Sequence, residues 1–155
     1  MADVRETLLI DASPLAVYAL VADLPRMGEW SPECERVVWR GGATHAVKGA
    51  RFFGYNRVGR VRWFTYGEVV AADPGRNLAF EITFGPMRVS RWEYYFLPHQ
   101  DGTCTLAEEW TDRRPTWFRV PATKALGSRT RANTRGIHRT LQAVKLVAEG
   151  SPDVG

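Results

Sequence analysis

The chain has 155 residues, of which 45% are hydrophobic and 25% are charged, and its formal net charge at pH 7 is +4. This length gives one domain with a sizeable core, and the composition excludes a disordered, collagen-like or coiled-coil chain. We expect one domain over residues 1–150, followed by a flexible tail over residues 151–155.

The N-terminal residues predict a strand and then a short helix. Residues 4–10 (VRETLLI) form the expected strand. Ser13 is a good N-cap, and Pro14 is a good first residue for a helix that runs to about Ala22. Pro25 interrupts the helical pattern, so a short turn is expected after it.

Six more strands are expected in the middle of the chain, separated by short turns. Strands that recur at about 8–12 residues with turn residues between them are typical of an antiparallel meander. The turn 73–76 shows the pattern well, because Pro74 sets φ and Gly75 permits a positive φ. The six strands are expected over residues 35–40, 50–57, 61–71, 78–84, 88–97 and 103–111.

The C-terminal part predicts one long amphipathic helix over residues 122–149, preceded by a loop or short amphipathic piece over residues 113–121. A curved antiparallel sheet needs a cover on one face, and this helix is the only expected element large enough to provide it. The apolar stripe of the helix is expected to comprise Ala125, Leu126, Asn133, Ile137, Thr140, Leu141, Val144 and Ala148.

Charge placement predicts which side chains of the strands face the core. Setting Arg51 opposite Glu68, so that both face water, also sets Asn56 opposite Trp63. Side chains alternate between the two faces of a strand, so the residues expected to face inward are Phe52, Gly54, Asn56, Trp63, Thr65 and Gly67. The residues expected to face outward are Phe53, Tyr55, Phe64 and Tyr66. In the later strands the expected inward sets are Phe80, Ile82 and Phe84; Trp92, Tyr94 and Phe96; and Cys104, Leu106, Glu108, Trp110 and Asp112.

An acidic residue, Glu108, falls on the same inner face as Leu106 and Trp110. Burying a carboxylate without partners is costly, so this group must meet a donor, shift its pKa upward or face a wet cavity. Asn56 and Asn133 are two further polar residues expected inside. A satisfied internal hydrogen-bond network and a functional site explain these residues equally well.

Two segments resemble the START-like superfamily (helix-grip, Bet v 1-like): residues 12–14 (ASP) before the short helix, and residues 23–32 (DLPRMGEWSP) after it. More narrowly, they are similar to the polyketide cyclase/dehydrase and lipid-transport group. Further matches are residues 49–52, 56–57, 108–110, 133–137 and 140–141. The resemblance implies an α+β helix-grip fold, in which a seven-stranded curved antiparallel sheet surrounds a long C-terminal helix and two short helices follow the first strand. It also implies a cavity for an apolar molecule, but it names no reaction.

Several kinds of chemistry are unsupported by the sequence. It contains no Gly-rich phosphate-binding motif and no nucleophile elbow. His45, His99 and His138 are too far apart for a metal site, so neither a metal nor a cofactor is expected. The chain has no apolar run of membrane-spanning length and no secretory leader, which favours a cytoplasmic protein with Cys34 and Cys104 reduced.

The 18 aromatic residues either fill the core or line a cavity, and the resemblance favours a cavity. We therefore expect an apolar ligand (a lipid, a polyketide-like molecule or an aromatic metabolite) to bind between the sheet and the long helix. The expected ligand-binding residues are Trp30, Phe52, Asn56, Trp63, Phe80, Phe84, Trp92, Tyr94, Phe96, Glu108, Trp110, Asn133 and Ile137. The alternative is an aromatase/cyclase or dehydratase, with Glu108 as base and Tyr94 or Asn56 as the donor to an oxyanion.

Basic residues are concentrated near the C-terminus. Eight Arg or Lys and no acidic residue lie between Arg113 and Arg139. This pattern is typical of the solvated face of a helix, and it also suits the docking of an acidic carrier protein, acidic lipid headgroups or nucleic acid. Nucleic acid is the least expected partner, because the aromatic residues are predicted to face inward rather than lie on the basic surface.

Overall fold

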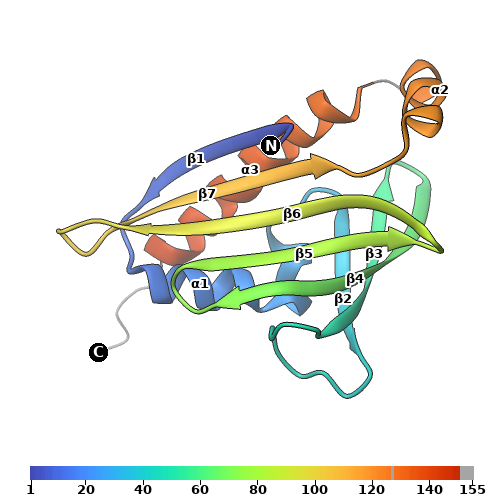
Figure 1. The fold of residues 1–155 in the computed structure, drawn as a ribbon. Coiled ribbons are helices and arrows are strands. Elements are labelled where there is room, and N and C mark those ends of the chain that lie inside the picture. The colour runs from blue at the N-terminus through green and yellow to red at the C-terminus, as the bar shows by residue number, and fades with distance from the viewer. Residues whose placement is uncertain (127, 151–155) are drawn as a thin grey trace.

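The computed structural model describes residues 1–126 and 128–150, so the expected tail over residues 151–155 lies outside the described residues. Seven antiparallel strands form one sheet in the order β1-β7-β6-β5-β4-β3-β2 (Figure 1). The strands are β1 (Val4–Ile10), β2 (Cys34–Arg40), β3 (Arg51–Val58), β4 (Val61–Asp73), β5 (Asn77–Phe84), β6 (Met87–Pro98) and β7 (Cys104–Asp112). The helices are α1 (Pro14–Ala22), the 3₁₀-helix η1 (Leu24–Glu29), α2 (Thr116–Leu126) and α3 (Arg129–Gly150).

The helices cover one side of the curved sheet. The long helix α3 crosses its inner face, α1 lies near one end of the molecule, and α2 lies at the other end (Figure 1). Contacts of α3 with the sheet are made mainly to β1 and β7, whereas η1 packs on β2. This is the helix-grip fold that the resemblance implied. Among the described residues, no helix combines the length and the apolar character needed to cross a membrane.

The local structure near the N-terminus follows from the residues named above. Ser13 is the N-cap of α1, and its hydroxyl accepts a hydrogen bond from the backbone N–H of Ala16 at 3.1 Å. Pro14 occupies the first helical position, where no N–H is needed. Pro25 lies in the first turn of η1, so the chain changes helix type there.

The predicted register of β3 against β4 is confirmed, with Arg51 opposite Glu68 and Asn56 opposite Trp63. Gly59 at φ +59° forms the tight turn that fixes this register. Two of the outward aromatic residues that follow from it lie beside arginines: the guanidinium of Arg36 lies 4.3 Å from the ring centroid of Tyr55, and that of Arg40 lies 4.3 Å from the centroid of Phe53. Cation–π contacts of this kind make an outer face with several rings acceptable.

The prediction of one helix over residues 122–149 is wrong, because α2 and α3 are separate helices. Ser128 ends the continuity by acting as the N-cap of α3: its hydroxyl accepts from the N–H of Arg131 at 3.4 Å, and its carbonyl accepts from the N–H of Ala132 at 3.3 Å. Of the two alternatives for residues 113–121, the short amphipathic piece is the closer one, since α2 begins at Thr116 and contains Pro121. A proline removes only one hydrogen bond from a helix, and here that loss does not end α2.

The inner stripe of α3 matches the prediction where the structure describes it. Its buried residues are Asn133, Ile137, Thr140, Leu141 and Val144, and Ala148 is half-buried. The side chains of Ala125 and Leu126, expected on the same stripe, lie outside the described part of the chain. The buried residues of α3 join a core formed with the sheet and α1, in which Tyr18 packs edge-on against Phe96 with ring centroids 5.2 Å apart.

Candidate functional site

A pocket of about 610 Å³ lies between α3 and the inner face of the sheet. Its lining comes from η1, from every strand except β1, and from one flank of α3. Because α3 packs mainly on β1 and β7 and η1 packs on β2, the inner face of the strands between them is not packed against α3. This divergence of helix and sheet creates the space.

Aromatic rings form the wall of the pocket that the sheet provides. Phe80, Trp92 and Trp110 are neighbours in register across β5, β6 and β7, and all three line the pocket. The indole N–H of Trp92 donates to the hydroxyl of Ser90 at 3.2 Å, which uses its polar atom and leaves the ring to the pocket. Phe52 packs edge-on against Phe80 with centroids 5.5 Å apart. Rings of this kind offer stacking to a planar or apolar guest.

Gly67 allows the ring of Phe52 to lie directly on β4. The two residues are opposite each other in register, and a Cβ atom at position 67 would lie 2.1 Å from Cζ of Phe52. No side chain larger than hydrogen fits there unless the ring moves. The absence of a side chain on Gly67 therefore helps to set the width of the pocket at this wall.

The most unusual polar feature of the pocket is the pair formed by Tyr94 and Glu108. These residues are opposite each other on β6 and β7, and the Tyr94 hydroxyl donates to Oε1 of Glu108 at 2.7 Å. Glu108 is only 1% exposed, and its Oε2 has no hydrogen-bond partner among the described residues. On the other side of β7, the half-buried Glu6 of β1 lies opposite Glu108 in register. Glu108 is also one of the residues that line the pocket, so this unpaired carboxyl oxygen is a buried polar atom at the pocket wall.

Burial raises the pKa of Glu108 from 4.5 to about 8, and the hydrogen bond from Tyr94 opposes part of this shift. Burial and the neighbouring Glu108 also raise the pKa of Tyr94 well above its usual value. Near neutral pH, Glu108 is therefore mostly protonated. Because Oε1 accepts from Tyr94, Oε2 is the oxygen left to carry the proton of the neutral carboxyl group.

Other polar groups lie nearer the edge of the pocket. The side-chain amide of Asn56 is within 3.4 Å of the carbonyl of Gly54 and of the hydroxyl of Thr65. Across the pocket, Arg129 of α3 forms an ion pair with Glu33 at 2.9 Å. The pocket lining therefore combines aromatic rings with amide, hydroxyl and charged groups.

The structure brings most of the predicted ligand-binding residues to one pocket. The ten that line it are Phe52, Asn56, Trp63, Phe80, Trp92, Tyr94, Glu108, Trp110, Asn133 and Ile137. The candidate catalytic residues Glu108, Tyr94 and Asn56 are all among them, and the first two are in direct contact.

Three predicted residues do not line the pocket. Trp30 and Phe96 are buried in the core, where Trp30 lies beside the guanidinium of Arg26. The inward placement of Phe84 is wrong, because this side chain is 52% exposed. Phe84 pairs with Met87 at the tip of the β5–β6 hairpin, beyond a register shift after Ile82, so the alternation of the strand no longer places it over the core.

Sequence reasoning missed several charged residues at the pocket. Arg57, Arg114, Arg129, Arg135 and Arg139 all line it. Long side chains on the flank of a helix or at the end of a strand reach over a pocket although their Cα atoms do not face inward. Helical periodicity placed Arg135 and Arg139 on the solvent face, and no pattern in the chain reveals how far their side chains extend.

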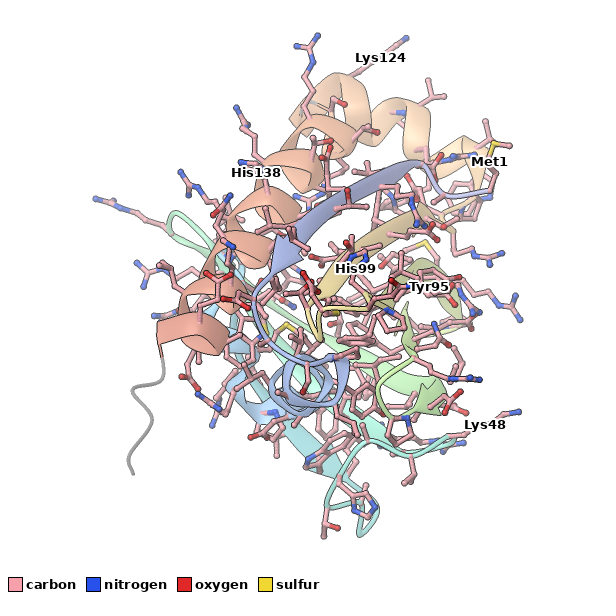
Figure 2. The ribbon with its side chains drawn as sticks, turned by 90° about the vertical axis from the view of Figure 1, so that its left-hand side faces the viewer. Met1, Lys48, Tyr95, His99, Lys124 and His138 are labelled. Carbon is pink, nitrogen blue, oxygen red and sulfur yellow. The ribbon has the colours of Figure 1, made fainter. Side chains whose placement is uncertain are left out.

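The histidines and cysteines do not form a reactive site. His45, His99 and His138 are exposed, and Figure 2 shows His99 and His138 at separate places on the surface. Over residues 1–126 and 128–150, no group of three or more potential ligand residues could hold a metal ion. Cys34 and Cys104 are free thiols, and burial raises the pKa of Cys34 to about 11, which makes it a poor nucleophile.

The chain belongs to the family described as polyketide cyclase / dehydrase and lipid transport, which it matches over residues 1–149. This agrees with the SRPBCC, or Bet v 1-like, helix-grip fold described above. Among curated proteins, none matches the chain significantly.

Solved structures support the same fold. The polyketide-cyclase-like protein Cgl2372 from Corynebacterium glutamicum is 30% identical, with 100% of this chain and 99% of that chain covered and a TM-score of 0.63. TTHA0849 from Thermus thermophilus is 17% identical, with 97% and 99% covered and a TM-score of 0.70. The di-domain aromatase/cyclase BexL from the BE-7585A biosynthetic pathway is 23% identical, with 96% of this chain and 50% of that chain covered and a TM-score of 0.70.

Proposed function

We propose that the protein binds an apolar small molecule (a lipid, a polyketide-like molecule or an aromatic metabolite) in the pocket between the sheet and α3. The observation that carries this proposal is a pocket of about 610 Å³ with an aromatic wall, a buried polar pair in that wall and charged side chains elsewhere in its lining. Ligand pockets in proteins have volumes of roughly 300–1,000 Å³ and this kind of lining. Apolar burial supplies affinity at about 25 cal/mol per Å² before the costs of association.

Glu108 gives the ligand an orientation. Its protonated Oε2 donates a hydrogen bond, so the part of the ligand beside it carries a neutral acceptor such as a carbonyl or hydroxyl oxygen. A ligand that lacks this oxygen leaves a buried polar atom unpaired, which costs about 1–3 kcal/mol. The pocket therefore selects ligands that combine an apolar body with an oxygen at this depth.

The test uses the neutral fluorescent dye N-phenyl-1-naphthylamine, whose emission rises in an apolar site. We expect the wild-type protein to bind it, and Trp92→Ala to weaken binding at least tenfold, because the indole forms part of the wall. Trp117→Ala is the matched control, since Trp117 is 75% exposed on α2 and lies away from the pocket. Equal affinities of wild-type and Trp92→Ala protein would contradict binding in this pocket.

A second candidate function is supported by the Tyr94–Glu108 pair. A carboxyl group with a pKa of about 8 is partly ionised at neutral pH and is then a stronger base than an ordinary carboxylate. Such a group can remove a proton next to a ketone, while Asn56, or Tyr94 once its hydroxyl has turned away from Glu108, donates to the oxygen of the enolate. The named aromatase/cyclase activity of BexL, which shares the fold, is compatible with this chemistry. In this version an acidic carrier protein in the cytoplasm docks on the segment Arg113 to Arg139 and delivers the substrate, and no nucleic acid is involved.

Proton exchange distinguishes the two candidates. 2-Tetralone is an apolar ketone, and the exchange of its α-protons for deuterium can be followed by NMR. If Glu108 is a base, wild-type protein accelerates exchange and Glu108→Gln does not, while dye binding is retained in both. Exchange at the same rate with and without wild-type protein would leave binding as the function of the pocket and reject the catalytic candidate for ketones of this class.

A further inference from the structure

Arginines surround the mouth of the pocket. Arg57 lies at the end of β3, next to the turn that contains Gly59, and Arg135 and Arg139 extend from the flank of α3. Gly136 lies between them in sequence and also lines the pocket. A Cβ atom at this position would make an ordinary contact with Pro32. Arg135 and Arg139 are one helical turn apart, so both lie on the flank of α3 that lines the pocket.

The arginines of the pocket differ in how their charges are balanced. Arg114 is paired with Asp112 at 2.7 Å and Arg129 with Glu33 at 2.9 Å. Arg57 donates to the carbonyl of Gly59 at 2.7 Å and has only a longer contact, 3.7 Å, with Glu35.

Arg135 and Arg139 have no ion pair and no side-chain hydrogen bond with any described residue. Like charges four residues apart on a helix repel each other, and no acidic residue occurs between Arg113 and Arg139 to offset them. The side chains of Arg135 and Arg139 are both exposed. Packing of α3 against the sheet therefore does not require two positive charges at these positions. An anion held between the two guanidinium groups would remove the repulsion and use their donors.

We propose that the mouth of the pocket, at Arg135 and Arg139, binds the anionic oxygen-acid group of the ligand, either a carboxylate or a phosphate. This inference rests on the proposed binding function and narrows the ligand to an amphiphile. The apolar body lies against Phe80, Trp92 and Trp110, and the acidic end remains at the solvent-exposed opening. There, charge–charge contacts do not require the acid to be fully desolvated.

The placement of the acidic end follows from the two ends of the pocket. Glu108 is buried at the sheet and bears no compensating cation, so an anion beside it would be repelled whenever Glu108 ionises. The exposed arginines at the mouth impose no such cost. An acidic amphiphile is therefore bound in one direction, with its acid outward.

The experiment measures displacement of N-phenyl-1-naphthylamine by decanoate, decyl phosphate and methyl decanoate, which share one apolar chain and differ in charge. We expect one or both anions to displace the dye from wild-type protein at a concentration at least tenfold lower than the neutral ester. The stronger of the two anions identifies the acid group. Added salt should reduce this preference, because the contacts are exposed.

The double variant Arg135→Gln/Arg139→Gln should lose most of the preference for the anions and keep its affinity for the dye and the ester. The matched control is Lys124→Gln/Arg131→Gln, which removes the same charge from exposed positions that do not line the pocket. It should keep the preference. Figure 2 shows Lys124 far from the middle of the sheet, at the end of the molecule formed by α2.

The outcomes separate this inference from the proposed function. Dye binding with equal displacement by anions and ester would overturn the anion site and leave the binding function intact. An unchanged preference in the Arg135/Arg139 double variant, or an equal loss in the control variant, would also overturn it. Failure of the wild-type protein to bind the dye would overturn both proposals.

Discussion

Tyr94 donates a hydrogen bond of 2.7 Å to Glu108, and this single contact joins the two titratable residues of the pocket wall. The contact satisfies one carboxyl oxygen of Glu108, and the other has no partner among the described residues. It also makes the protonation of Glu108 dependent on a neighbour whose own pKa is raised by burial and by Glu108. The energetics of this pair lead to two of the predictions below.

Replacement of Glu108 by glutamine should change how stability depends on pH. The folded protein holds a proton on Glu108 up to about pH 8, whereas the unfolded chain releases it near the ordinary pKa of 4.5. The contribution of Glu108 to stability is therefore present below about pH 4.5 and is lost as pH rises toward 8. One pKa unit corresponds to about 1.4 kcal/mol, so the loss is on the order of a few kcal/mol. Urea unfolding of both proteins at pH 5 to 9 measures it, and parallel curves would refute the raised pKa.

Tyr94→Phe should destabilise the protein and shift the same transition. Loss of the hydroxyl leaves Oε1 of Glu108 without a donor, at a cost of about 1–3 kcal/mol. Because the hydrogen bond lowers the pKa of Glu108, its removal should move the pH-dependent loss of stability to higher pH. A double-mutant cycle with Glu108→Gln isolates the coupling between the two residues. Additive effects of the two substitutions would show that the pair is not coupled.

Glycine at position 28 should be required by packing rather than by backbone conformation. A Cβ atom there would lie 2.2 Å from the backbone carbonyl oxygen of Glu35, and φ is not positive. Gly28→Ala must push η1 away from β2, and we expect a loss of about 1–3 kcal/mol.

Gly136→Ala is the matched control for Gly28→Ala. Its Cβ would meet Pro32 at 3.6 Å, an ordinary contact, and alanine favours a helix over glycine by about 1 kcal/mol. Thermal unfolding of both variants should show a lower midpoint for Gly28→Ala and an equal or higher one for Gly136→Ala. Equal changes in both variants would reject the packing argument.

The ion pair between Asp112 and Arg114 should contribute more to stability than the exposed pairs. The two side chains are only 8% and 13% exposed, and Arg114 also donates its backbone N–H to Asp112 at 3.0 Å. Arg114→Met removes the guanidinium and leaves a largely buried carboxylate with the backbone N–H of position 114 as its remaining donor, at a cost of about 3 kcal/mol. Arg26→Met, which removes an exposed pair with Glu29, should cost much less. Urea unfolding at pH 7 compares them, and similar losses would contradict this ranking.

The β3–β4 hairpin and the inner face of β7 were predicted well, because strand alternation and turn residues alone determine them. Alternation and the turn at Gly59 were enough to place Arg51 opposite Glu68, because a shift of one residue would have buried both charges. The same alternation identified Glu108 as an acid on the inner face, from its spacing to Leu106 and Trp110 alone. Its contact with Tyr94 depends on the pairing of β6 with β7, which the strand pattern of either segment alone does not specify.

The errors have equally specific causes. The break before α3 depends on a serine cap at Ser128 within a segment whose periodicity is otherwise helical. The exposure of Phe84 follows from a register shift near a hairpin tip, and periodicity assumes a regular strand. The unpaired arginines at the pocket mouth depend on the path of long side chains, which no rule of spacing describes. Local sequence patterns therefore predicted most of the strand residues that line the pocket. The arginines that line it depend on tertiary packing, which these patterns do not describe.

Gly67 has a consequence for how this fold can adapt. The ring of Phe52, which lines the pocket, lies against the backbone of Gly67, where a side chain would otherwise be. A single methyl group at that position would clash with the ring, and because Phe52 lines the pocket, any movement of the ring would change the shape of the pocket. Selectivity in such a scaffold can change through one carbon atom on a neighbouring strand, with every residue that touches the guest left as it is.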